Sequence, residues 1–420
     1  MLVSQALCEA RFWISCADAG DVPRAAPVTR RMCATGKPVF VLGGYPAGLA
    51  VIRSLGVRGI RVFCVYSTDR ESGQHSKYLD GAFCSPPPER QEAFVEYLVG
   101  LAPSHPRSVL IPTSDETLEA VARAKERLEE HFDVACMGFR RVDTVLDKRK
   151  TYKVAAEGGI PAPRTFTPKC ARELKDYAEV IKYPCLVKPT SSYAHFKTFG
   201  RKMTKVDNAD SLVRAWQETT EASVDVVLQE FIPGPETAGI NYNAYIQNGA
   251  PVAECTARKL RSSPPELGFP TVVVSEHIPE IIAVGRRLLQ LLNVDGFSCT
   301  EFKFDERDRE YKLMEVNARP NMSGALSVAC GVDFPSMIYD DLLGARISSV
   351  ERYREGVCWI DTLPDLRQRV RLGRRAALRD FTAPYRAPHV NAVLDVHDLR
   401  PFTASLLCSG KAVLRRLPTS

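Results

Sequence analysis

The chain has 420 residues, of which 45% are apolar and 25% are charged. These proportions are typical of a globular protein with roughly two to four domains, and they exclude a disordered, collagen-like or coiled-coil protein. No run of about 18 apolar residues predicts a membrane span, and charged residues interrupt the N-terminal segment where a secretory signal would need an apolar run. The 13 cysteines form no C-x-x-C pair, so we expect reduced, mostly buried thiols in a cytoplasmic protein.

The net charge of +6 is concentrated at the C-terminal end, where residues 345–420 carry 14 basic and seven acidic side chains. A basic segment of this kind can bind nucleic acid or an acidic membrane surface. However, no aromatic residues are interleaved with the arginines between 367 and 379. Four apolar residues predict an apolar side on a helix in this segment: Leu366, Val370, Leu372 and Leu378. This pattern favours a solvated amphipathic helix over a nucleic-acid site.

Residues 1–36 show no clear period, and we expect a poorly ordered extension there. Between 37 and 145, apolar runs alternate with amphipathic stretches, which predicts a parallel sheet with helices on its faces. The glycine-rich turn at 43–48 lacks the spacing of a dinucleotide-binding fingerprint, so a structural turn is favoured. The expected strands lie at 39–42, 60–65 and 108–111, and the expected helices lie at 46–55, 89–101 and 114–131.

Between residues 146 and 344 the pattern is more varied. The segment 190–205 has no period and is expected to be a loop, and Asn248-Gly249 predicts a hairpin turn. The expected helices lie at 147–156, 171–182, 208–221 and 279–292, and the expected strands at 183–189, 224–232, 241–246, 251–255, 296–304 and 310–316.

The last predicted hairpin brings two carboxylates together. If its turn centres on residue 308, Glu301 lies opposite Glu315, and Asn317 shares a face with Glu315 because side chains alternate along a strand. Buried carboxylates in this position repel each other, and a divalent cation would remove the conflict. This set of oxygen ligands suits magnesium. The alternative is a solvent-facing hairpin whose carboxylates never meet.

Three cations accompany this hairpin. Arg319 follows it and presents a guanidinium suited to a bidentate contact with phosphate or carboxylate. Lys188 stands in an otherwise apolar strand, where a lone ammonium needs an anion. Lys148 begins a helix, which is an unfavourable place for a cation unless it serves a ligand. For each lysine, a solvated surface position is the alternative.

The order of these motifs resembles the ATP-grasp superfamily. The matching segments are Asp147-Lys148 before Gly159-Ile-Pro-Ala-Pro163, the strand that contains Lys188, Gln229-Glu230 with Pro233-Gly-Pro-Glu236, Glu301, and Glu315-Val-Asn317-Ala-Arg319. The resemblance covers about residues 38–343. Within the superfamily it is similar to the carboxylate–amine ligases related to D-aspartate ligase and to the synthetase modules of carbamoyl-phosphate synthetase.

This resemblance implies an α/β fold in three parts. A parallel-sheet pre-grasp domain would span 37–145, and a two-lobed α+β grasp domain would span 146–344, with a lid subdomain at about 183–235. A small basic C-terminal subdomain, expected to be a helical cap with strands near 392–396, would span 345–420.

The resemblance also implies roles for individual residues. Lys148 and Lys188 would hold the nucleotide phosphates, and Arg319 together with Lys188 would stabilise the transferring phosphoryl group. Mg²⁺, or Mn²⁺ in its place, would be held by Glu301, Glu315 and Asn317. The other nucleotide contacts would be Lys197 or Lys202 in the lid loop, Glu230 and Ile232 at the adenine, partly through backbone groups, and Glu236 at the ribose. Gln229 and Phe231 would also bind ATP.

Substrate contacts are expected in two places. In relatives, the region of residues 254–268 faces the acyl substrate, so Arg258, Lys259 and Arg261 would bind a carboxylate, with ordinary surface charge as the alternative. Asp115 follows a parallel strand at its carboxyl end, where ligands commonly bind, although a helix cap explains it equally well.

These roles imply an ATP-dependent carboxylate–amine ligase that forms an amide or peptide bond through an acyl phosphate and releases ADP and phosphate. The expected substrates are amino acids or short peptides. We expect no membrane or nucleic-acid partner, and a homodimer by analogy. The alternatives are phosphorylation of bicarbonate, as in carboxylases and carbamoyl-phosphate synthetase, and a non-catalytic ATP-binding protein.

Overall fold

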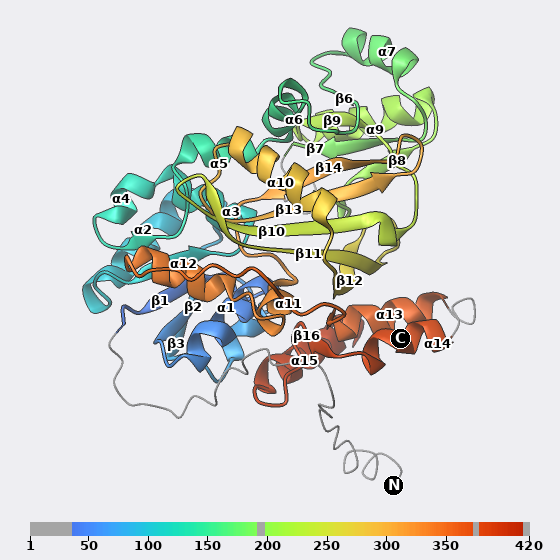
Figure 1. Cartoon of the computed structure of the whole chain (residues 1–420). Helices are drawn as coiled ribbons and strands as arrows, with labels where there is room; N and C mark the ends of the chain where they lie inside the picture. Colours follow the sequence, from blue (N-terminus) through green and yellow to red (C-terminus); the bar gives the residue numbers. More distant parts are fainter. Residues whose placement is uncertain (1–35, 191–197, 373–377, 415–420) are drawn as a thin grey trace. The chain divides into compact units, whose positions relative to one another are not determined.

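The computed structural model describes residues 36–190, 198–372 and 378–414 (Figure 1). The expected N-terminal extension lies outside these residues, apart from Gly36. No helix in the described part of the chain is both long and apolar enough to cross a membrane. The cytoplasmic location and the three domain boundaries stay predictions.

Short apolar runs build a parallel sheet of five strands, in the order β3 (Gly81–Cys84), β2 (Val62–Tyr66), β1 (Val39–Leu42), β4 (Val109–Pro112) and β5 (Asp133–Val134). On β1, Val39 and Val41 enter one apolar core, and Phe40 and Leu42 enter another. Both faces are therefore covered, as the sequence predicted. The accompanying helices are α1 (Pro46–Val57), α2 (Gln91–Leu101), α3 (Asp115–Arg123), α4 (Lys125–Glu129) and α5 (Phe139–Leu146), with 3₁₀ turns η1 (Ser72–His75) and η2 (Ala102–Ser104).

Two details of this region differ from the prediction. The helix expected at 114–131 is divided at Ala124, whose backbone (φ −105°, ψ 18°) leaves the helical region between α3 and α4. Strands β3 and β5 were not predicted, because β3 has no buried residue and β5 has only two residues, which is too short for a periodic pattern.

A second sheet has seven strands, in the order β14 (Glu310–Asn317), β13 (Gly296–Asp305), β10 (Gly239–Gln247), β11 (Ala250–Ser263), β12 (Phe269–Ser275), β15 (Cys358–Ile360) and β16 (His389–Asn391). All neighbouring pairs are antiparallel except β15 and β16. One face packs against α6 (Lys148–Glu157) and α10 (Pro279–Leu291), and part of the other packs against α11 (Gly324–Ala329) and α12 (Phe334–Leu342).

A third sheet has four strands, in the order β6 (Thr165–Phe166), β9 (Val226–Glu230), β7 (Cys185–Pro189) and β8 (Thr204–Val206). Its core combines Val187 and Leu228 with Leu174 of α7 (Ala171–Val180) and Leu212 of α9 (Ala209–Glu221). Strand β6 and helix α7 precede residue 183, where the lid was expected to begin. Their side chains nevertheless belong to the same core.

The C-terminal part adds β15 and β16 to the second sheet, together with α13 (Thr362–Leu372), α14 (Leu378–Arg386) and α15 (Arg400–Leu414). The expected apolar side of the basic helix is wrong for α13, because Leu366 is 43% and Val370 is 81% exposed. Its buried side is polar instead: Asp365 accepts hydrogen bonds from Arg261, Thr271 and Tyr385. The strand expected near 392–396 lies a few residues earlier, at β16.

Candidate active site

Two carboxylates face each other across the β13–β14 hairpin, as the sequence predicted. Glu301 and Glu315 are directly paired in the register of these strands. The predicted turn centre at residue 308 is wrong, because Asp305 pairs with Glu310, one residue out of step with that centre. A β-bulge between Glu301 and Phe302 restores the alignment, so the predicted pairing holds for a reason that the pattern did not contain.

Each carboxylate has its own lysine. Glu301 accepts a hydrogen bond from Lys259, and Glu315 Oε1 lies 3.0 Å from Lys148 Nζ. Burial alone would raise the pKa of Glu315, but Lys148 and Lys188 outweigh this effect and hold that pKa at about 2. The pKa of Glu301 is also lowered, since Lys259 outweighs its burial and the repulsion from Glu315. Both groups are therefore anionic at neutral pH.

Lys188 lies beside these carboxylates and is 4% exposed. Its Nζ donates to Gln229 Oε1 at 3.0 Å and approaches Tyr152 Oη and Met314 O at 3.4 Å. Burial and the nearby charge of Lys148 lower the pKa of Lys188 to about 8. None of these three hydrogen-bond partners is a carboxylate, so the ammonium remains available for an anionic ligand.

Arg319 connects the hairpin to the five-stranded sheet. Its Nε donates to Asp115 Oδ1 at 2.8 Å, and its Nη2 donates to Asn317 Oδ1 at 3.1 Å. Burial would lower the pKa of Arg319, but Asp115 outweighs this effect and raises it. Ser114 is the N-terminal cap of α3, and Asp115 is the first residue of that helix. Asp115 is therefore not the cap, and its carboxylate contacts Arg319 instead.

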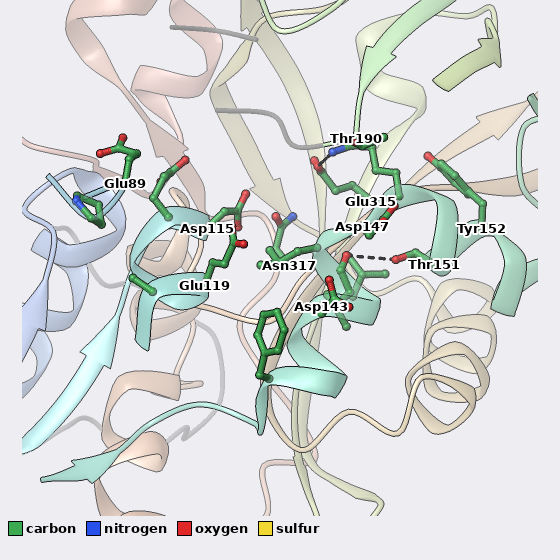
Figure 2. A pocket seen from close by; sticks show the side chains of 18 of the residues that line it. Glu89, Asp115, Glu119, Asp143, Asp147, Thr151, Tyr152, Thr190, Glu315 and Asn317 are labelled. Atoms are coloured by element: carbon green, nitrogen blue, oxygen red, sulfur yellow. Dashed lines mark hydrogen bonds and ion pairs between the residues drawn. The ribbon is translucent and has the colours of Figure 1, made fainter. Parts of the chain in front are cut away.

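A cleft of about 410 Å³ lies between these elements (Figure 2). Figure 2 shows side chains from α3 on one side and from α5, α6 and β14 on the other. The lining includes Asp115, Lys148, Tyr152, Glu315 and Asn317. Residues predicted from separate motifs therefore border one opening.

The residues expected at the adenine follow one another at the end of β9. Glu230 Oε1 lies 2.9 Å from Arg307 Nη2, and Ile232 O accepts a hydrogen bond from Lys303 Nζ at 2.8 Å. The ring of Phe231 lies 5.3 Å from Lys303 Nζ. Ile232 is one of the residues that the resemblance assigns to adenine, and its carbonyl accepts from Lys303 in this arrangement.

Glu236, the expected ribose contact, lies in the 3₁₀ turn η3 (Glu236–Ala238). Its Oε1 accepts a hydrogen bond from the backbone N of Glu266 at 3.2 Å, and the Glu266 carboxylate lies 3.0 Å from Lys205 Nζ of β8. The loop between β11 and β12 therefore links the ribose position to the third sheet.

The expected lid contact at Lys197 lies outside the described residues. Its alternative, Lys202, is described and stands 3.5 Å from the ring centre of Phe269. Burial lowers the pKa of Lys202 to about 8, although Glu301 acts in the opposite direction. Lys202 therefore adds a further cation to the surroundings of Glu301.

The three cations expected to bind the acyl substrate separate in the structure. Lys259 contacts Glu301, whereas Arg258 forms a bidentate ion pair with Glu276, with N–O distances of 2.6 and 2.7 Å. Arg261 forms another with Asp365 at 2.9 and 2.8 Å, which fastens β11 to α13. Only Lys259 joins the group around the two carboxylates.

The described residues include no cluster of three or more His, Cys, Asp or Glu side chains that could hold a metal. The predicted magnesium set is smaller, with two carboxylates and one amide oxygen. These oxygens fit a hard cation, since Glu301 and Glu315 are paired and Asn317 follows on the same strand face. A cation would compete with Lys148, Lys259 and Arg319 for these oxygens, so magnesium stays a prediction.

Sequence reasoning missed Tyr152, whose Oη donates to Met314 O at 2.6 Å and lies beside Lys188 Nζ. Tyr152 is 7% exposed and stands four residues after Lys148 on α6, which places both on one face of the helix. This spacing could have identified it.

No family model matches the chain. A sequence relative is the D-aspartate ligase of Enterococcus faecium (strain Aus0004), which is 23% identical over 270 residues, or 60% of this chain. The match covers 64% of that relative, so the chain spans less than two thirds of its length.

Solved structures that share the architecture include a biotin carboxylase and an amino acid ligase. The biotin carboxylase–β-γ-ATP complex of Campylobacter jejuni matches with a TM-score of 0.63 and 16% identity, over 77% of this chain and 74% of that one. The L-amino acid ligase of Bacillus licheniformis matches with a TM-score of 0.57 and 18% identity, over 73% and 74%. At these identities the matches show the fold, and the activity has to be argued from the site.

Proposed function

The chain has the ATP-grasp fold, as its motifs predicted, and from this premise we propose that it is an ATP- and magnesium-dependent carboxylate–amine ligase. The reaction would join a carboxylate to an amine through an acyl phosphate and release ADP and phosphate. The observation that carries this proposal is the group of cations around the paired carboxylates Glu301 and Glu315.

The charges of this group do not balance without a ligand. Glu301, Glu315, Asp115 and Glu116 supply four negative charges, and the five cations around them are Lys148, Lys188, Lys202, Lys259 and Arg319. The depressed pKa values of Lys188 and Lys202 express the cost of holding them there. A triphosphate would supply the missing negative charge, which supports nucleotide binding at this place.

Each side chain then has a role that follows from its position. Lys148 and Lys188 bind phosphate oxygens, and Gln229 and Tyr152 keep Lys188 directed toward the carboxylates. Arg319, held by Asp115, stabilises charge on the transferring phosphoryl group. Magnesium, held by Glu301, Glu315 and Asn317, would supply further charge neutralisation on the phosphates.

The chemical steps need positioning rather than a protein nucleophile. A substrate carboxylate oxygen attacks the γ-phosphorus, and the bond to ADP breaks. The amine then attacks the acyl carbon, phosphate leaves, and the amine loses a proton. D-aspartate ligase and L-amino acid ligase are the names of two similar proteins, which supports amino acids as the substrate class here.

The test is release of ADP and phosphate from ATP and magnesium, screened against amino acids singly and in pairs and against bicarbonate. Release that requires both a carboxylate and an amine, and that disappears in Glu315→Gln, is expected. The matched control is Glu310→Gln on the same strand, where Glu310 is exposed and pairs with Lys312 at 2.8 Å. This variant should keep the wild-type rate.

Two other results would contradict the proposal. Release with bicarbonate alone would favour the carboxyphosphate alternative. ATP binding without release under any condition would favour a non-catalytic nucleotide-binding protein.

A further inference from the structure

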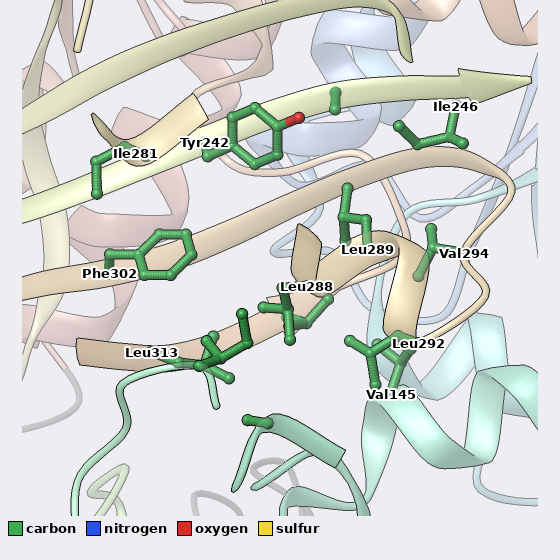
Figure 3. Packing of buried hydrophobic residues seen from close by; sticks show 14 of the residues in the cluster. Val145, Tyr242, Ile246, Ile281, Leu288, Leu289, Leu292, Val294, Phe302 and Leu313 are labelled. Carbon is green, nitrogen blue, oxygen red and sulfur yellow. The ribbon is translucent and has the colours of Figure 1, made fainter. Parts of the chain in front are cut away.

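The sheet face that carries Glu301 and Glu315 continues onto strand β10. Tyr242 of β10 and Phe302 of β13 point into the apolar core on the other side of the sheet (Figure 3). Because side chains alternate along a strand, Asn241 points away from that core. The register pairs Asn241 with Glu301, and Glu301 with Glu315, so these three side chains form one row across the sheet.

Asn241 is buried with an unused hydrogen-bond acceptor. The residue is 3% exposed, and its Oδ1 has no hydrogen-bond partner among the described residues. Buried amide oxygens are nearly always paired in folded proteins, and an unpaired one is destabilising. A ligand that brings an N–H or O–H donor to this position would satisfy it.

The next row along the strands is polar but uncharged. Asn321 Nδ2 donates to Asn243 Oδ1 at 3.0 Å, and a small cavity of about 10 Å³ opens here, large enough for one water-sized group. None of the described side chains that line this cavity carries a charge. They include Asn243, Cys255, Ala257, Ser275, Asn321 and Ser323.

This row is continuous with Asn241. Asn243 is two residues further along β10, on the same face, and Ala257 is the register partner of Asn241 on β11. The arginines that the sequence offered for the acyl substrate are engaged elsewhere, Arg258 with Glu276 and Arg261 with Asp365. The row beside the carboxylates therefore ends in a neutral pocket rather than a cationic one.

We propose that Asn241 recognises the carboxylate substrate, with its Oδ1 accepting an N–H from the α-amino group of an amino acid that has a small, uncharged side chain. This inference rests on the proposed ligase function and names the class of its acyl donor. Cβ atoms of directly paired residues are about 5 Å apart. An amino group two bonds from the carboxyl carbon can therefore reach Asn241 while the carboxylate stays beside Glu301 and its cations.

The neutral row sets the expected selectivity. A second carboxylate placed there would meet no charged side chain in the cavity lining, and Arg319, which contacts Asn317 of the same row, is already paired with Asp115. Acidic amino acids should therefore be poor donors. Bicarbonate has no α-amino group. Its single O–H would be the only donor that it could offer to Asn241 Oδ1. A metal ion is held by the neighbouring carboxylates in the proposed function and does not need Asn241.

The experiment measures acyl phosphate directly by trapping it with hydroxylamine as the hydroxamate, with ATP and magnesium present. The donors are both enantiomers of alanine and of serine, both enantiomers of aspartate, and bicarbonate. We expect hydroxamate from alanine or serine. In Asn241→Ala, the KM for that donor should rise on the order of 10- to 100-fold, with kcat and the KM for ATP nearly unchanged.

Two further variants separate recognition from folding. Asn241→Ser keeps a shorter acceptor and should show an intermediate KM. Thr300→Val is the matched control, because Thr300 Oγ1 is also buried and unpaired among the described residues, but Thr300 pairs with Tyr242 and so lies on the core face. This control should leave every KM unchanged, and neither Asn241 variant should lower the melting temperature.

The outcomes distinguish this inference from the function on which it rests. Hydroxamate formation with an unchanged donor KM in Asn241→Ala overturns the role of Asn241 alone, as does a preference for aspartate. A rise in the KM for ATP or in the magnesium requirement would assign Asn241 to the metal and also overturn it. If the wild type binds Mg–AMP-PNP by calorimetry but makes no hydroxamate from any donor, the ligase proposal fails and this inference fails with it.

Discussion

The two larger sheets contribute to the candidate site in different ways. The five-stranded sheet is parallel and both faces of β1 are buried, so it contributes Asp115 from beyond the carboxyl end of β4. The seven-stranded sheet is mostly antiparallel, with an apolar core on one face and Glu301 and Glu315 on the other. A sheet covered on both faces has only its ends available for chemistry, whereas an alternating sheet can also use the part of a face that no helix covers.

The largest expected effect comes from replacing Lys188, which lies beside the carboxylates on the face of the seven-stranded sheet. Lys188→Met should lower kcat for ADP release about 10²- to 10³-fold, because it removes a preorganised charge from the transferring phosphate. Steady-state kinetics measure this. Lys182→Met, an exposed lysine just before the same strand, should retain wild-type kinetics. Equal losses in both variants would show that the buried position of Lys188 has no special role.

The next largest effect is expected on stability, when the contact that attaches the C-terminal part to the seven-stranded sheet is removed. Arg261→Met leaves Asp365 buried without its cation and should lower the free energy of unfolding by about 2–4 kcal/mol in urea denaturation. The KM values for substrates should not change. Lys153→Met, in an exposed pair with Glu157, should cost less than about 0.5 kcal/mol. A higher substrate KM with normal stability would instead return Arg261 to the role that the sequence suggested.

The core of the seven-stranded sheet should tolerate less change than the helices of the five-stranded one. A Cβ added at Gly285 of α10 would lie 2.3 Å from Tyr242 Cδ1, so Gly285→Ala should destabilise the protein by about 1–3 kcal/mol. Gly100 of α2 has no atom within 4 Å of an added Cβ. Gly100→Ala should therefore stabilise it by about 0.5–1 kcal/mol. Chemical denaturation measures the free energy of unfolding of both variants. If both substitutions changed it in the same direction, the contrast would be refuted.

Asp115 tests whether the parallel sheet matters to the chemistry at all. Asp115→Asn removes the charge that positions Arg319 and should lower kcat about tenfold, with little change in stability. The control is Glu119→Gln, one turn further along α3, whose carboxylate pairs with Arg123. If Asp115→Asn had no effect, Arg319 would be positioned by β14 and Asn317 alone.

The smallest effect concerns pH at the edge of the seven-stranded sheet. Burial, assisted by Asp365, raises the pKa of Asp361 from 3.8 to about 6. The folded state therefore keeps this proton to a higher pH than the unfolded state. The contribution of Asp361 to stability is fully present below about pH 4 and is lost as the pH rises through about 6. Asp361→Asn should remove that decrease and add about 1 kcal/mol at pH 7. Denaturation at pH 4 and pH 7 measures both, and an unchanged pH profile would contradict it.

Local pattern predicted much of this molecule. The apolar runs at 39–42 and 108–111 predicted buried parallel strands, and period-two alternation placed Glu315 and Asn317 on one strand face. The pairing of Glu301 with Glu315 was also predicted, but it depends on a β-bulge that the pattern did not show. These features depend on side-chain spacing along one or two neighbouring segments, which a sequence displays directly. Weak signals failed, as for the two-residue strand β5 and for the polar buried side of α13, because tertiary partners rather than periodicity define them.

The sequence by itself predicted most of the element types, an order of motifs that resembles the ATP-grasp superfamily, and the identity of the charged groups. The tertiary structure alone decided which charges meet: Arg319 with Asp115 across 204 positions, Lys259 with Glu301 across 42, and Arg261 with Asp365 across 104. It also left the Oδ1 of Asn241 without a partner in the described residues beside the carboxylates. The physical reason is that the pairing of a cation with an anion depends on their positions in space and on their loss of hydration. The order of residues along the chain gives neither quantity directly.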